Sequence, residues 1–225
     1  MRCTVSTFLR LGAVARMNGE SAPVCGIAGV IALSDRGPDP SVVEHMTRRL
    51  DDRSSHAWGY YVDGGVGLGI AGPAVAASQG PDQPATNEEQ SVRVVLAGRI
   101  SNAPPVRDAL LRAGLRFRTY SDAEVVAHAW EHYGECALDL FTGIFAIAVW
   151  DERRHRLFLA VDRVGETRLH YAITSAWLIF ASEVDAAVVH PALNSERDLA
   201  TVRRSLSFDV DRQAPLETPL TNFGR

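Results

Sequence analysis

The side chains that could act as nucleophiles or metal ligands are few and scattered. The chain has three cysteines, Cys3, Cys25 and Cys136, and seven histidines. The cysteines are too few for a disulfide framework and lack the paired spacing of a zinc site, so we expect a reducing compartment and no metal. A free cysteine is most often a small buried hydrophobe, and this is our expectation for Cys136. His128 and His132 have helical spacing but no His-Glu-x-x-His context, and we interpret them as an exposed helix face.

A glycine-rich segment carries the second chemical motif. Gly67, Gly69 and Gly72 match the Gly-x-Gly-x-x-Gly fingerprint of dinucleotide-binding proteins. Pro73 follows at once, and residues 74–84 do not form a long amphipathic helix whose N-terminus could hold a pyrophosphate. We therefore interpret the segment as a glycine-rich hairpin.

The elements that position these residues are strands in two blocks around a pair of helices. Apolar runs and turn residues predict strands at 25–33, 59–62, 66–70, 92–96, 145–150, 157–161, 169–173 and 177–181. Helical spacing predicts a helix from an N-cap at Ser41 to about residue 51, helices at 105–113 and from Ser121 or Asp122 to Gly134, and short helices at 184–189 and 199–206. This order favours an α+β layered domain over regular βαβ alternation.

Composition excludes several classes of protein. With 225 residues, 46% hydrophobic residues and a net charge of -4, the chain is expected to form one large soluble domain. No apolar run approaches the ~20 residues of a membrane span, and no basic patch indicates nucleic acid. Residues 1–24 read as a leader, but Arg10 interrupts their apolar stretch and no cleavage site follows, so we expect a cytoplasmic protein and not a secreted one.

Four segments in order carry a family resemblance: the run from Val24 to Val30, the run from Thr142 to Asp151, Asp162-Arg163-Val164-Gly165, and Ala181-Ser182-Glu183. Together they make the chain similar, from about Cys25 to Pro191, to the N-terminal glutaminase domain of glutamine-hydrolysing asparagine synthetases, a class II glutamine amidotransferase. The resemblance implies an N-terminal nucleophile hydrolase fold, a four-layer αββα sandwich with two antiparallel sheets inside and helices outside.

The resemblance also implies a catalytic chemistry and its residues. Cys25 would be the first residue of the mature chain, and its thiol would attack the side-chain amide of L-glutamine while its own α-amine accepts the proton. A thiol of pKa ≈ 8.5 and an amine of about 7.7–8.0 are matched for this task. Gly98 matches the backbone oxyanion donor, Asp122 the acid that holds the substrate ammonium, and Arg53 the arginine of a substrate loop. Without the resemblance, Asp122 reads as a helix N-cap and Arg53 as a loop anchor.

Several positions depart from the family pattern. Cys25 is internal, so either a propeptide is removed or, as we favour, translation starts at position 24. Gly72 stands where the family has the arginine that clamps the glutamine carboxylate, Ala97 replaces the oxyanion amide, and Arg99 replaces an acid. We therefore expect glutamine hydrolysis to be weak or lost, as in a pseudoenzyme.

The expected domains are a leader at 1–24, an amidotransferase-like domain at 25–193, and a connector at 194–225 toward an absent synthetase domain. The partner would be an ATP-dependent synthetase or cyclase, and ATP and magnesium would belong only to that domain because no Ser-Gly-Gly-x-Asp-Ser segment occurs here. The alternatives are a competent glutaminase once Cys25 is exposed, or a non-catalytic module of a lasso-peptide cyclase or β-lactam-synthetase-like system.

Overall fold

A computed structural model describes residues 4–7, 25–50, 56–73, 83–163 and 167–193. Arg53 and the helix expected at 199–206 lie outside these ranges. The strands are β1 (Thr4–Thr7), β2 (Gly26–Ala32), β3 (His56–Asp63), β4 (Val66–Pro73), β5 (Ala85–Thr86), β6 (Val92–Ile100), β7 (Gly143–Asp151), β8 (Arg156–Val161), β9 (His170–Ile173) and β10 (Trp177–Ala181). The helices are α1 (Pro40–Arg49), α2 (Ala103–Arg112), α3 (Asp122–Tyr133), the 3-10 helix η2 (Gly134–Leu140) and α4 (Val184–Ala187).

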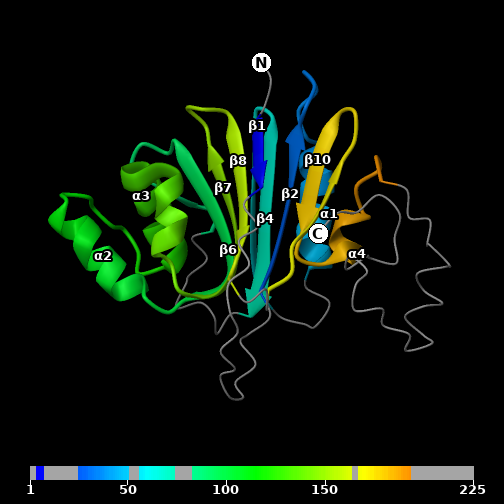
Figure 1. Cartoon of the computed structure of the whole chain (residues 1–225). Helices are drawn as coiled ribbons and strands as arrows, with labels where there is room; N and C mark the ends of the chain where they lie inside the picture. The colour runs from blue at the N-terminus through cyan, green and yellow to red at the C-terminus, as the bar shows by residue number, and fades with distance from the viewer. Residues whose placement is uncertain (1–3, 8–24, 51–55, 74–82, 164–166, 194–225) are drawn as a thin grey trace, which may run out of the picture.

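Two five-stranded sheets form the centre of the molecule. One has the strand order β1-β8-β7-β6-β5 and the other the order β3-β4-β2-β10-β9. All neighbouring strands are antiparallel except β1, which is parallel to β8. Figure 1 shows α2 and α3 on the outer side of the first sheet and α1 and α4 on the outer side of the second. The predicted αββα layering is therefore confirmed.

The hydrophobic core consists of three clusters, and strand β6 contributes to two of them. Val94 and Leu96 pack with α3 on one face, while Val95 and Ala97 face the other sheet. Both faces are apolar along residues 94–97 because this part of the strand is covered on two sides. A third core cluster lies between the second sheet and helices α1 and α4.

The glycine-rich segment forms the predicted hairpin. Asp63 of β3 pairs with Val66 of β4 across a two-residue turn, so the dinucleotide motif is a strand and not a phosphate loop. Gly67 lies under α1, and a Cβ there would be 2.5 Å from Val43 Cγ2. The glycines therefore let α1 approach β4 closely.

The ends of α3 follow the sequence signals. The hydroxyl of Ser121 accepts a hydrogen bond from the Glu124 N–H at the N-cap, and Gly134 ends the helix with a φ of 60°. Helix α1 differs from the prediction, since its N-cap is Asp39 and not Ser41. Asp39 Oδ1 accepts from the Ser41 N–H at 2.9 Å, and Pro40 occupies the first helical position.

Two expectations about side-chain exposure are wrong. His128 is only 1% exposed, and its ring packs 4.6 Å from Phe117 between Glu124 and Glu131. Periodicity misplaced it because α3 is covered on more than one side. Cys136 is exposed, since the 3-10 helix η2 turns Ala137 inward in its place.

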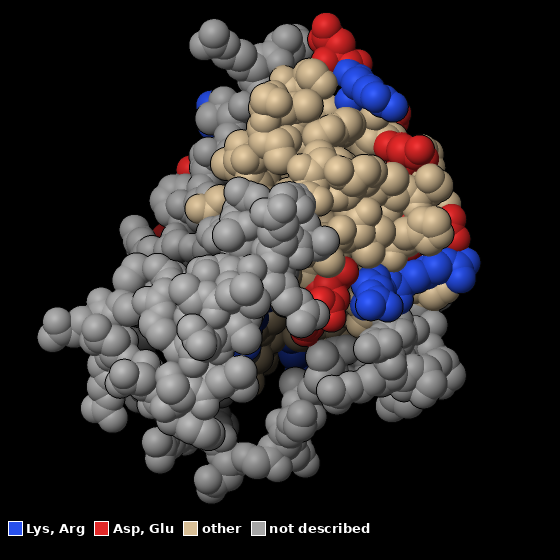
Figure 2. Space-filling model, turned by 90° about the vertical axis from the view of Figure 1, so that its right-hand side faces the viewer, with Lys and Arg blue, Asp and Glu red and all other residues tan. Residues whose placement is uncertain are grey.

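The molecular surface includes a broad uncharged area. Figure 2 shows it on the side of α1 and α4, bordered by Arg, Asp and Glu side chains. Among the helices of the described ranges, none has both the length and the apolar composition needed to cross a lipid bilayer.

Candidate active site

Cys25 lies directly before β2, at the end of the sheets where β4 and β6 also end. Its side chain is partly exposed. A Cβ added to Gly72 would lie 2.5 Å from Cys25 Sγ and 3.0 Å from Cys25 Cβ. The thiol therefore occupies the space into which any side chain at position 72 would project.

Gly98 approaches Cys25 from the opposite sheet. Its φ is 96°, a left-handed conformation that favours glycine, and a Cβ there would overlap the carbonyl oxygen of Ile144. The Gly98 N–H donates a hydrogen bond to the Cys25 sulfur. The structure thus joins two predicted catalytic residues, Cys25 and Gly98.

The thiol is in a mixed environment. Burial raises the pKa of Cys25 above its ordinary value, and the hydrogen bond from Gly98 opposes that rise in part. Burial disfavours the thiolate because it removes water from the charge, whereas an N–H donor stabilises it. The net direction is a thiol that is less ionised at neutral pH than a free cysteine.

Asp122 is the first residue of α3 and is positioned by the same strand. Its Oδ2 accepts a hydrogen bond from the Ile100 N–H at 2.8 Å. Burial raises the pKa of Asp122, while the Ile100 N–H and the charges of Arg99 and Arg107 oppose this rise. Since Ser121 is the N-cap, Asp122 is not used for capping and the N-cap interpretation of it was wrong.

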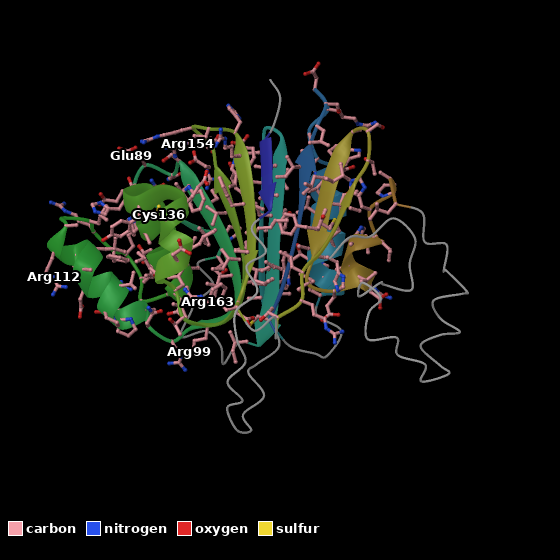
Figure 3. The ribbon with its side chains drawn as sticks, in the orientation of Figure 1. Glu89, Arg99, Arg112, Cys136, Arg154 and Arg163 are labelled. Atoms are coloured by element: carbon pink, nitrogen blue, oxygen red, sulfur yellow. The ribbon has the colours of Figure 1, made fainter. Side chains whose placement is uncertain are left out.

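The positions that depart from the family pattern are also visible. Ala97 is fully buried in the core between the sheets, so no amide side chain faces the thiol from this position. Figure 3 shows Arg99 at the end of β6, pointing away from the ribbon. Arg53, the fourth predicted site residue, lies outside the described residues.

Two residues of this region were not singled out from the sequence. Gln83 hydrogen bonds to β6 two residues before Gly98, and Arg107 donates to the Thr119 carbonyl oxygen near Asp122. Neither carries a motif of its own, and only the tertiary structure brings them here. Within the described ranges, no group of three or more His, Cys, Asp or Glu side chains is placed to hold a metal ion.

Comparison with known proteins agrees with this geometry. Residues 24–222 match the family model described as glutamine amidotransferase domain. The chain is 32% identical over 171 residues to asparagine synthetase [glutamine-hydrolyzing] 2 of Bacillus subtilis. The aligned region covers 75% of this chain and 23% of that protein. It is 31% identical over 206 residues to asparagine synthetase [glutamine-hydrolyzing] 3 of the same organism, and the aligned region covers 89% of this chain and 32% of that protein.

A plant protein is similar to the same extent. The chain is 35% identical to asparagine synthetase [glutamine-hydrolyzing] 1 of Arabidopsis thaliana, covering 65% of this chain and 25% of that protein. It therefore spans about a third or less of the length of these curated relatives.

Among solved structures, glutamine phosphoribosylpyrophosphate amidotransferase from B. subtilis aligns with a TM-score of 0.60 at 19% identity, covering 73% of this chain and 43% of that chain. At that identity the likeness shows the fold, which is the N-terminal nucleophile hydrolase sandwich. The family match and the sequence relatives place the chain in the class II glutamine amidotransferase domain family, of the type found in asparagine synthetases.

Proposed function

We propose that this domain hydrolyses glutamine weakly or not at all, and that it serves as an amidotransferase-like module for an ATP-dependent amide-forming partner. The observation that carries the proposal is the contact between Gly72 and the Cys25 thiol. A clamp for the glutamine carboxylate needs a cationic side chain at position 72. Glycine has none, and the thiol fills the space beside it.

The surroundings of the thiol support the same conclusion. Ala97 offers no amide to a developing oxyanion, and loss of one such donor costs about 10²–10³-fold in rate. Asp122, the expected ammonium ligand, already accepts from the Ile100 N–H and lies near the charges of Arg99 and Arg107. The carboxylate end of a free glutamine would therefore lack its cationic partner, and the positive charges of Arg99 and Arg107 would oppose an ammonium group beside Asp122.

The partner part of the proposal rests on the curated relatives, of which this chain matches only one part. The curated relatives are named as asparagine synthetases, and the chain covers 23% to 32% of the two from B. subtilis. A synthetase or cyclase, as a further domain or a separate subunit, would bind ATP and magnesium and form the amide. A fold of this kind can remain as a docking module after its own chemistry is lost.

A second candidate is a competent glutaminase that acts once Cys25 becomes the N-terminal residue. The hydrogen bond from Gly98 to the Cys25 sulfur favours it, because a backbone donor is already in place beside the nucleophile. In that case the thiol adds to the glutamine amide carbon while the α-amine takes the thiol proton. The tetrahedral intermediate then returns that proton to the leaving nitrogen and expels ammonia, which leaves a thioester that water hydrolyses to glutamate and the free thiol.

The two candidates are separated by mass spectrometry after treatment with diazo-oxo-norleucine, a glutamine-analogue electrophile. The protein is prepared in two forms, one with the printed sequence and one beginning at Cys25. The proposal expects no adduct on Cys25 in either form. An adduct of one molecule per chain on the form beginning at Cys25, absent after Cys25→Ser, would support the glutaminase instead.

A further inference from the structure

Within the described ranges, the edge of β6 that faces away from β7 has a neighbouring strand only at Arg93 and Val94. β6 pairs with β7 along its whole length, from Val92 to Ile100, whereas β5 pairs only with Arg93 and Val94. In a strand, the backbone groups of every second residue point to the same side. Beyond Val94, the side facing β5 therefore presents the backbone groups of Leu96, Gly98 and Ile100.

Three side chains bind these backbone groups. The Leu96 N–H donates to Gln83 Oε1 at 2.9 Å, and Gln83 Nε2 donates to the Leu96 carbonyl at 3.4 Å. The Gly98 N–H donates to the Cys25 sulfur, and the Ile100 N–H donates to Asp122 Oδ2 at 2.8 Å. The donor that contacts the thiol thus lies between two backbone groups that are each held by a side chain.

Gln83 is well placed to act as one of these two supports. Its side chain is buried, and its amide both donates to and accepts from Leu96, as a strand residue would. Its backbone carbonyl packs against Gly59 of β3, where a Cβ would overlap the oxygen. Gln83 therefore connects the edge strand of one sheet to β6 of the other.

We propose that Gln83 is a positioning residue for the site: its amide, together with the Asp122 carboxylate, holds the edge of β6 so that the Gly98 N–H points at the Cys25 thiol. Glycine in a left-handed conformation has wide backbone freedom, and a strand edge without a partner frays readily. Support at both neighbouring positions restricts the direction of the donor. Gln83 acts through β6 and does not itself touch the thiol.

The test measures ionisation of the Cys25 thiol in the printed sequence carrying Cys3→Ser and Cys136→Ser, so that Cys25 alone reacts. The rate of alkylation by iodoacetamide is followed against pH by intact mass. In Gln83→Met the amide is lost and the Gly98 hydrogen bond to the sulfur weakens. We expect the pKa of Cys25 to rise by at least about half a unit, which lowers the thiolate fraction about threefold below the pKa.

Asn87, which follows β5, offers a matched control because it holds the other end of β6. Its buried amide oxygen accepts from the Ser91 and Val92 N–H groups at 2.9 Å and 3.0 Å, at the far end of β6 from Gly98. Asn87→Leu therefore also removes a buried amide that holds the backbone of this region. We expect it to lower the melting temperature as Gln83→Met does, but to leave the pH dependence of Cys25 alkylation unchanged.

A second variant approaches the same position from the other sheet. Gly59→Ala pushes against the carbonyl of Gln83 and leaves its amide intact. It is expected to raise the pKa of Cys25, as Gln83→Met does. Either of the two variants, if it folds, therefore tests whether Gln83 positions the Gly98 N–H. The proposal is overturned if the folded variant has the same alkylation profile as its parent, or if Asn87→Leu shifts the profile equally.

This inference concerns the same site as the proposed function but does not depend on glutamine turnover. The alkylation profile reports how the thiol is held, whereas adduct formation by the glutamine analogue reports whether the pocket accepts glutamine. An unchanged profile in Gln83→Met would overturn the positioning role alone.

Discussion

Substitution of Gly72 by alanine tests the contact that defines the site. The new Cβ would lie 2.5 Å from Cys25 Sγ, 3.0 Å from Cys25 Cβ and 3.2 Å from Cys25 Cα. Real Cβ atoms do not approach another atom at the first of these distances, so the thiol must turn or shift. Because its present position is where it accepts from the Gly98 N–H, we expect that hydrogen bond to be lost.

The size of the effect follows from the strength of one hydrogen bond. A net contribution of about 0.5–1.5 kcal/mol corresponds to a rise of about 0.4–1 unit in the pKa of Cys25. Well below the pKa, the rate of alkylation by iodoacetamide should then fall between about twofold and tenfold. Crowding of the packed site should also cost about 1–3 kcal/mol in the free energy of unfolding.

The assay is the pH dependence of alkylation in the Cys3→Ser, Cys136→Ser background, with urea unfolding alongside. Gly65→Ala is the control, because a Cβ there would lie 3.8 Å from Ala32 Cβ, an ordinary contact. The reasoning is refuted if Gly72→Ala folds with an unshifted Cys25 profile, since the thiol would then not be held where the structure has it.

Three further predictions concern buried polar groups. Burial raises the pKa of Asp122, so its contribution to stability is most favourable when it is protonated and is lost as the pH rises. Relative to Asp122→Asn, the protein should lose unfolding free energy as the pH rises above about 4, measured by urea titration. Trp130→Phe removes the Nε1–H donor to the buried Asp151 carboxylate and should cost about 1–3 kcal/mol by the same measurement, with an unchanged fold by circular dichroism. Glu124→Gln weakens the acceptor of the Thr119 N–H and hydroxyl, and amide exchange at Thr119 should become faster while the strands keep their protection.

Local chemistry accounts for the parts of the fold that the sequence predicted well. Ser121 and Gly134 bound α3 as expected, because capping depends on residues within one turn of the helix end. The order of strands and helices followed from apolar runs between turn residues. The αββα arrangement, in contrast, came from the family resemblance, since runs of apolar residues do not say which strands are neighbours.

The errors share a physical cause, which is that exposure depends on contacts distant in the sequence. His128 was expected on an exposed face, but its ring packs against Phe117 and is buried. Cys136 was expected to be buried, but η2 presents Ala137 to the core. The roles of Gln83 and of the edge of β6 that it contacts depend on strand pairing and were not predicted from the sequence.

In the candidate site, too, some features were predicted from the sequence and others depend on the tertiary structure. Cys25, Gly98 and Asp122 were selected by resemblance. The structure brings the first two into contact, and Asp122, at the start of α3, accepts from the backbone of the same edge of β6. The conflict between the Cys25 thiol and a side chain at position 72 was not foreseen. It emerges only when β2 and β4 are paired in register, with Gly26 opposite Ala71.

The most direct test of the central claim is glutamate release from L-glutamine by the chain beginning at Cys25, whose α-amine is then free to act as the base. We predict no glutamate above that formed by the Cys25→Ser variant. Turnover that depends on Cys25 in the otherwise unchanged chain would contradict the claim that this pocket has lost its hold on glutamine.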